Sequence, residues 1–153
     1  KMTFYKYFPS KEKLIEECLI QHNINLQTSL NATLEQCDPT NYLEQIKAIF
    51  HWYTVWFESE DFNGCMFQKA LIEVIKIYPS TLKPATEYKT WLTNLTQNLL
   101  RNMDIQNPNH LANLIVSILD GMTIQAHINR HTVQLEEYWK RVEHLIQFEK
   151  SMA

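Results

Sequence analysis

Apolar residues recur every three or four positions over long stretches of this chain, and that spacing constrains the fold more than any other feature. An α-helix with one buried face has this period, whereas a strand with one buried face alternates at every second residue. The clearest example consists of Leu43, Ile46, Phe50, Tyr53 and Phe57. The chain has only two glycines and five prolines, too few for the turns of a β fold of this length. The sequence therefore predicts an all-α fold.

The breaks between the helical patterns contain proline, glycine or short polar runs. Six helices are expected, covering about residues 11–36, 43–57, 65–77, 80–103, 109–130 and 133–151. With 153 residues, of which 45% are hydrophobic, the chain is long enough to bury one sizeable core.

Charge and cysteine content limit the classes of function. The formal net charge of −3 argues against a nucleic-acid-binding surface spread over the whole chain. Cys18, Cys37 and Cys65 are odd in number and lack the spacing of metal ligands, which favours a reducing compartment, so a cytoplasmic protein is expected. No apolar run approaches the roughly 18 residues of a membrane-spanning helix.

Known catalytic and metal-binding patterns are missing from the sequence. His127 and His131 are four residues apart and can share a helix face, but no third ligand accompanies them. We find no nucleophile elbow, phosphate-binding loop or paired carboxylates. The expectation is a protein that is not an enzyme and has neither a metal nor a cofactor.

The segment from Thr3 to Leu14 reads TFYKYFPSKEKL and carries the most specific pattern in the chain. Pro9 disfavours helix at the residue before it, and Ser10 can cap a helix that starts at Lys11. Tyrosine and lysine side chains here are suitable donors to phosphate oxygens. The alternative is an aromatic helix end that packs on its neighbour.

The order of residues from Lys1 to Leu14 resembles the segment that closes the helix-turn-helix in TetR/AcrR-family transcriptional regulators. In that family a recognition helix ends in Tyr-x-[Tyr/His]-Phe, and a Ser-Lys pair opens the next helix. The resemblance implies that residues 1–9 end a DNA-binding domain, most of which would precede Lys1. Residues 10–153 would form the ligand-binding and dimerisation domain, with residues 10–36 as a linker helix. The DNA-contacting residues implied are Lys1, Thr3, Tyr5, Tyr7 and Lys11.

Two shorter motifs agree with this resemblance. Asn63 to Met66 resembles the Gly-Cys-[Leu/Met] helix start of many members, and Leu119 to Met122 resembles a Leu-x-Gly-[Leu/Met] motif in the penultimate helix. The family pattern further implies a regulatory body with a ligand cavity and a dimeric four-helix bundle. That bundle would be built from helices at about 109–130 and 133–151.

Cys65 is a candidate sensor of electrophiles or oxidants. If Asn63 caps the helix, the thiol lies in its first turn, where the helix dipole and Lys69 would favour thiolate. The context also resembles the quinone- and aldehyde-responsive repressors of N-ethylmaleimide reductase operons. The alternative is a small buried side chain with no redox role.

Aromatic residues between positions 50 and 67 can line a pocket for a planar or apolar ligand, or can be core alone. The candidate ligand-binding residues are Phe50, Tyr53, Trp56, Phe57, Phe67, Lys69 and Glu73. The resemblance implies a homodimeric, ligand- or electrophile-responsive regulator, a repressor by the family's usual mode, with double-stranded operator DNA and a small-molecule effector as partners. A helical ligand-binding module without DNA binding remains the alternative, and it leaves the segment from Thr3 to Leu14 unexplained.

Overall fold

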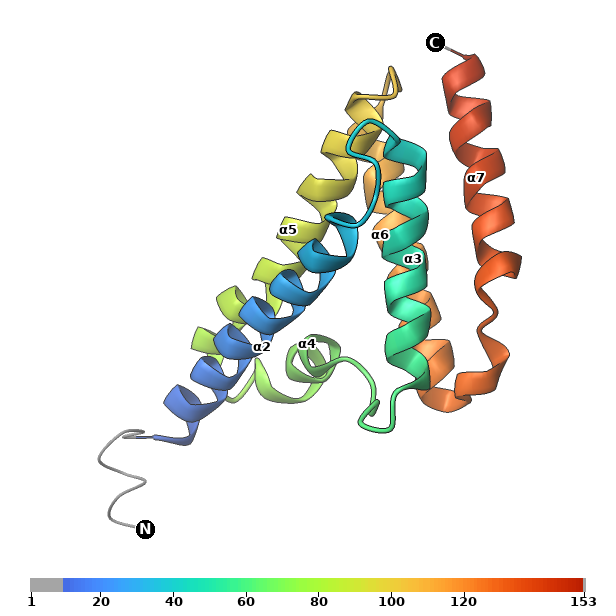
Figure 1. The fold of residues 1–153 in the computed structure, drawn as a ribbon. Coiled ribbons are helices and arrows are strands. Elements are labelled where there is room, and N and C mark those ends of the chain that lie inside the picture. Colours follow the sequence, from blue (N-terminus) through green and yellow to red (C-terminus); the bar gives the residue numbers. More distant parts are fainter. Residues whose placement is uncertain (1–9, 153) are drawn as a thin grey trace. The chain divides into compact units, whose positions relative to one another are not determined.

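The computed structural model describes residues 10–152, and this part of the chain is built from six α-helices with no strand (Figure 1). The α-helices are α2 (Lys11–Leu34), α3 (Tyr42–Glu58), α4 (Met66–Lys69), α5 (Leu82–Arg101), α6 (Pro108–Ile128) and α7 (Leu135–Ser151). A π-helix, η1 (Ala70–Val74), follows α4, and 3₁₀ turns occur at η2 (Pro79–Thr81) and η3 (Arg130–Thr132). The predicted all-α fold is confirmed.

The chain forms two compact units. The first contains residues up to Ser29 together with Cys65–Tyr88, and so includes α4, η1 and η2. The second contains Leu30–Gly64 and the chain from Lys89 onward, and so includes α3, α6 and α7. The boundaries fall inside α2 and α5, so each of these long helices contributes to both units.

Side chains cap the two helices that begin the described chain. The Ser10 hydroxyl accepts a hydrogen bond from the backbone N–H of Lys13 at 3.1 Å, which satisfies one of the unpaired donors in the first turn of α2. Asn41 does the same for α3 by accepting from the Glu44 N–H at 3.1 Å. The predicted Ser10 cap and the predicted start of a helix at Lys11 are therefore confirmed.

The predicted helix over residues 65–77 is shorter and more irregular than the apolar spacing indicates. Regular α-helix covers only Met66–Lys69 and then widens into η1, where the Ile75 N–H donates to the Ala70 carbonyl at 3.1 Å. That bond joins residues five apart, which is the π-helical pattern. The predicted helix over 80–103 opens as the 3₁₀ turn η2, which begins at Pro79, and α5 starts at Leu82.

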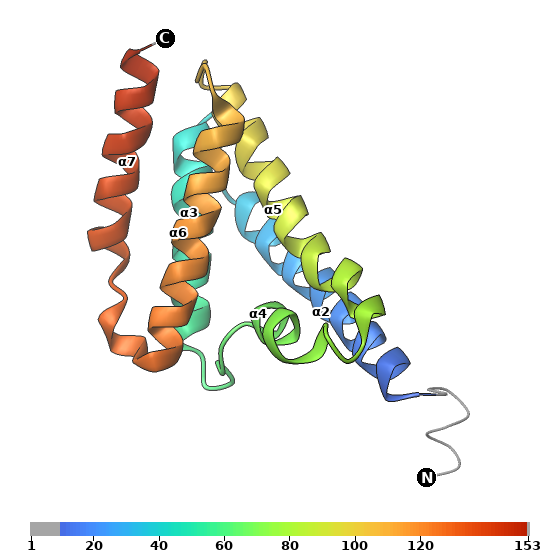
Figure 2. The ribbon, with the colours of Figure 1, turned by 180° about the vertical axis from the view of Figure 1, so that it is seen from behind.

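In the second unit, α3 contacts both α6 and α7 (Figures 1 and 2). The buried side of α3 consists of Ile46, Ile49, Phe50, Tyr53 and Phe57. From α7 the core receives Trp139, Val142 and Ile146. The helical spacing of the sequence over residues 133–151 predicts Leu135, Tyr138 and Leu145 on the same buried face as Val142 and Ile146. These three are only half-buried, because α7 turns Trp139 inward instead of Tyr138.

By length and mean hydropathy, α6 is apolar enough to cross a membrane, the only such helix in the described residues. Part of its apolar surface is buried in the core of the second unit. Eight residues of α6 are buried: Leu111, Ala112, Ile115, Val116, Leu119, Met122, Thr123 and Ala126. A core helix with this much buried surface has the same composition as a spanning segment.

Candidate functional site

Of the residues expected to contact DNA, the structure places only Lys11. Lys1, Thr3, Tyr5 and Tyr7 lie outside the described residues. Lys11 is exposed at the first position of α2, where backbone N–H groups favour an anion. This location is compatible with a phosphate contact.

The start of α2 is tied to η2 within the first unit. The Glu12 carboxylate accepts hydrogen bonds from the Ser80 hydroxyl at 2.6 Å and from the Ser80 N–H at 3.4 Å. These two residues are far apart in sequence, so no local pattern predicts the contact. It links the first turn of α2 to the segment that opens α5.

The predicted ligand-binding residues fall into both units. Tyr53, Trp56 and Phe57 form a continuous ring cluster in the second unit, with ring centroids 5.8 to 6.1 Å apart. Phe62 joins this cluster at 5.0 Å from Trp56 and 5.3 Å from Phe57. Phe50 lies elsewhere on α3, with its ring 5.8 Å from that of Trp139, and so belongs to the α3–α7 core.

The other three predicted ligand-binding residues belong to the first unit. Phe67 is buried and stacks on Tyr88 with a centroid distance of 5.4 Å and an interplanar angle of 19°. It also contacts the ring of His22 in α2, at 5.1 Å and 50°. Lys69 is half-buried and Glu73 is exposed. His22 was not predicted, because one histidine in a helical pattern gives no signal of what it faces.

Cys65 does not lie in the first turn of a helix, and Asn63 does not occupy the N-cap position. Cys65 is itself the N-cap residue of α4, with extended backbone (φ −91°, ψ 122°), and its side chain makes no capping hydrogen bond. The side chain is half-buried. The helix begins later than predicted because the chain first turns at Gly64, whose φ is +77°.

Gly64 is held against the C-terminal end of α6. A Cβ atom at this position would lie 2.7 Å from Nδ1 of His127, closer than nonbonded atoms normally approach. The His127 ring is in turn 6.4 Å from Phe62, edge-on. Beyond α6, Nη1 of Arg130 donates to the Ser59 carbonyl at 3.3 Å. The α3–α4 loop is thus fixed at both ends by residues from α6 and η3.

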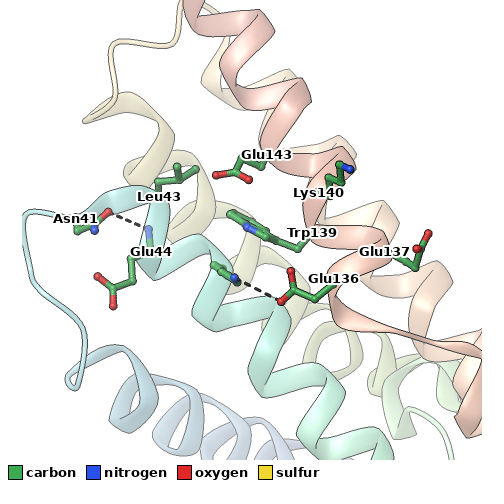
Figure 3. Close-up of a pocket in the computed structure, with 9 residues that line it drawn as sticks. Asn41, Leu43, Glu44, Glu136, Glu137, Trp139, Lys140 and Glu143 are labelled. Carbon is green, nitrogen blue, oxygen red and sulfur yellow. Dashed lines mark hydrogen bonds and ion pairs between the residues drawn. The ribbon is translucent and has the colours of Figure 1, made fainter.

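An open groove between α3 and α7 was not predicted from the sequence (Figure 3). It has a volume of about 450 Å³. Across it, the Lys47 ammonium pairs with the Glu136 carboxylate at 3.5 Å. The remaining lining residues are Asn41, Leu43, Glu44, Glu137, Trp139, Lys140 and Glu143. Carboxylates predominate, and both partners of the ion pair are exposed enough to be well solvated.

Several large apolar side chains of α6 and α7 remain exposed. They are Leu114, Ile124, Ile128 and Phe148, and Met152, directly after α7, is exposed as well. In addition, no group of three or more His, Cys, Asp and Glu side chains within residues 10–152 is arranged to hold a metal ion.

The fold of this chain is similar to that of a solved structure, although its sequence matches no family model. No protein-family model matches the sequence, and no curated protein does so either. The structure is similar to the crystal structure of a TetR-family transcriptional regulator from Streptomyces coelicolor, with a TM-score of 0.85 and 19% sequence identity. The match covers 98% of this chain and 78% of that one. The chain therefore has a TetR-like, all-α fold.

Proposed function

We propose that this chain is the regulatory part of a DNA-binding transcriptional regulator that responds to a small molecule. The observation that carries the proposal is the similarity to a TetR-family transcriptional regulator over 98% of the chain. The segment from Thr3 to Leu14 supports it independently, because its Ser-Lys pair opens α2 as the family pattern requires. Residues 1–9 would then end the DNA-binding domain, and residues 10–153 would bind the effector and a second copy.

The proposed regulator acts as a homodimer through α6 and α7. A two-fold interface requires one self-complementary surface, and exposed apolar side chains on both helices supply such a surface. Two recognition helices in the dimer would have to match successive major grooves, about 34 Å apart. A change in the pivot of α2 would alter that separation and release the operator.

The proposed signal is either reversible binding of an effector or covalent modification of Cys65. The ring clusters around Trp56 and Phe67 offer apolar surface for a planar ligand. Cys65 adjoins Gly64, so a modification there would act on a backbone that has little room to adjust. Release of DNA by either route makes the protein a repressor, and such a protein works in the cytoplasm.

The proposed function is tested by a gel shift of the full-length protein on its own upstream DNA. The wild type and the Cys65→Ser variant are compared before and after treatment with a quinone. Release of the wild type alone identifies a covalent sensor, whereas release of both identifies a reversible pocket. If neither form is released, quinones are not the signal. If neither form binds the DNA, the chain is not a regulator of its own promoter, and the alternative of a helical binding module gains support.

Lys11 provides a second test on the same DNA. Lys11→Ala is expected to weaken binding equally across DNA sequences and to lower the salt dependence by about one counterion, since it would remove one phosphate contact. Lys13→Ala is the matched control, because the Lys13 ammonium already pairs with Glu17 at 3.1 Å. Equal effects of the two substitutions would contradict a specific phosphate contact at Lys11.

A further inference from the structure

One polar atom of the first unit is buried without a partner. Nε2 of His22 has no hydrogen-bond partner, and it is the one buried side-chain nitrogen or oxygen in residues 10–152 of which this is true. A buried polar group left unpaired carries a free-energy penalty. An apolar side chain at this position would pack against Phe67 without that penalty.

The surroundings of His22 are aromatic. Its ring lies 5.1 Å from that of Phe67, and Phe67 stacks on Tyr88 at 5.4 Å. Burial lowers the pKa of His22, so the ring is neutral at pH 7. A neutral imidazole offers one donor and one acceptor, and a hydroxyl can pair with either.

The backbone beside this ring cluster is irregular as well. Phe67 lies one turn before η1, where the Ile75 N–H reaches back to the Ala70 carbonyl in the π-helical pattern. Short π-helical segments are uncommon and occur frequently at functional sites. The unpaired Nε2 of His22 and the π-helix are two separate observations, and Phe67 links them because it contacts the His22 ring and lies one turn before η1.

We propose that Nε2 of His22 is the hydrogen-bonding contact for the hydroxyl of a neutral aromatic effector whose ring lies against Phe67 and Tyr88. This inference rests on the proposed function and specifies the chemistry of its effector. His22 selects the hydroxyl, and the rings supply apolar contact to any planar molecule. An aromatic carboxylate is disfavoured, because it would bind best to a protonated imidazole.

The test uses two probes that differ by one hydroxyl, 2-naphthol and naphthalene. Their dissociation constants are measured by calorimetry on full-length protein without DNA. In His22→Phe the ratio of the two constants is expected to shift by about tenfold against 2-naphthol, the size of one lost hydrogen bond. His22→Gln, which retains a donor and an acceptor, is expected to restore part of the preference. His51→Phe, an exposed histidine of α3, is the matched control and is expected to leave the ratio within about twofold of the wild type.

Stability provides a second readout. Because the substitution removes an unpaired buried atom and keeps a ring, His22→Phe is expected to raise the urea midpoint of the effector-free protein. A lower midpoint would mean that the imidazole is a paired structural group, which overturns the proposal. An unchanged probe ratio, or failure of both probes to bind the wild type, also overturns it.

The outcome is separable from that of the proposed function. If the probe ratio shifts but upstream DNA is not bound, His22 is a ligand contact in a protein that is not a regulator of that DNA. If the DNA is bound but the ratio is unchanged, only the assignment of His22 fails.

Discussion

At the scale of single residues, Gly64 has a backbone conformation and surroundings that suit only glycine. Its φ of +77° lies in the left-handed region, and the His127 ring occupies the space that a Cβ atom would need. By contrast, Gly121 is helical and a Cβ there would meet nothing within 4 Å. The two glycines of the chain are therefore opposite cases, and they form a matched pair for mutagenesis.

Gly64→Ala is expected to lower the free energy of unfolding by about 1–2 kcal/mol from the backbone alone, with a further loss from the clash with His127. Gly121→Ala is expected to raise it by about 0.5–1 kcal/mol, because alanine favours the helix. Urea denaturation measures both. Adding His127→Ala to Gly64→Ala should restore the part of the free energy of unfolding that is lost to the clash, but not the part that is lost to the backbone conformation. Equal effects at the two glycines would contradict the local geometry.

His22 is expected to make stability depend on pH. Burial lowers the pKa of His22 in the folded state below its ordinary value of 6.5, so the unfolded chain takes up the proton first as pH falls. The contribution of His22 is therefore neutral above about pH 6.5 and becomes destabilising below it. The urea midpoint of the wild type should therefore fall relative to that of His22→Gln as the pH is lowered through 6.5. A difference that is independent of pH would contradict the burial of the imidazole.

The Cys37 thiol is expected to react with an alkylating agent more slowly than the Cys18 thiol. Burial raises its pKa, and the charge of Glu44 raises it further, so less thiolate is present at neutral pH. Cys18 is exposed on α2 and serves as the internal reference. Mass spectrometry during iodoacetamide labelling should show Cys18 modified before Cys37, and the reverse order would contradict the assignment.

At the scale of elements, α7 is held to the second unit by apolar contact with α3. Trp139 is 4% exposed and meets Phe50, while Val142 and Ile146 complete the buried face. The Lys47–Glu136 ion pair crosses the same interface, but its side chains are 43% and 76% exposed. Because solvent screens the two charges at that exposure, the ion pair contributes little to the free energy of unfolding.

Trp139→Ala is expected to lower the free energy of unfolding by about 3–5 kcal/mol, the usual cost of removing a buried tryptophan. Lys47→Ala is expected to change it by no more than about 1 kcal/mol. Tyr138→Ala, at the half-buried neighbouring position, is the control for loss of an aromatic ring from α7. Chemical denaturation ranks the three, and a larger effect for Lys47→Ala than for Trp139→Ala would contradict this account.

The same elements show what could be predicted from sequence. The apolar period located the helices, and the Ser10 cap fixed the start of α2, because both are local properties. The sequence does not decide whether Tyr138 or Trp139 faces the core, since each lies about one helical turn from Val142. The π-helix η1 has no proline or glycine to mark it, and the His22–Phe67 contact joins segments distant in sequence. These features depend on tertiary packing.

At the scale of the whole molecule, the exposed apolar residues of α6 and α7 are the basis of the proposed dimer. Ile128 on α6 is 77% exposed, and Ile72 in η1 is exposed to nearly the same extent, 76%. Ile128→Asp is expected to shift sedimentation from dimer towards monomer, because it places a charge in a desolvated interface. Ile72→Asp is the matched control and should leave the mass unchanged. Dissociation by both variants, or by neither, would contradict an interface built on α6 and α7.

The central claim is that two copies of this chain present one operator-binding unit. It is tested most directly by sedimentation equilibrium of the full-length protein on a duplex of its own upstream DNA. We expect a complex of two chains per site, or a multiple of two, and loss of that complex in Ile128→Asp. A complex of one chain per duplex would contradict the dimeric mechanism, and the absence of any complex would contradict the assignment as a DNA-binding regulator.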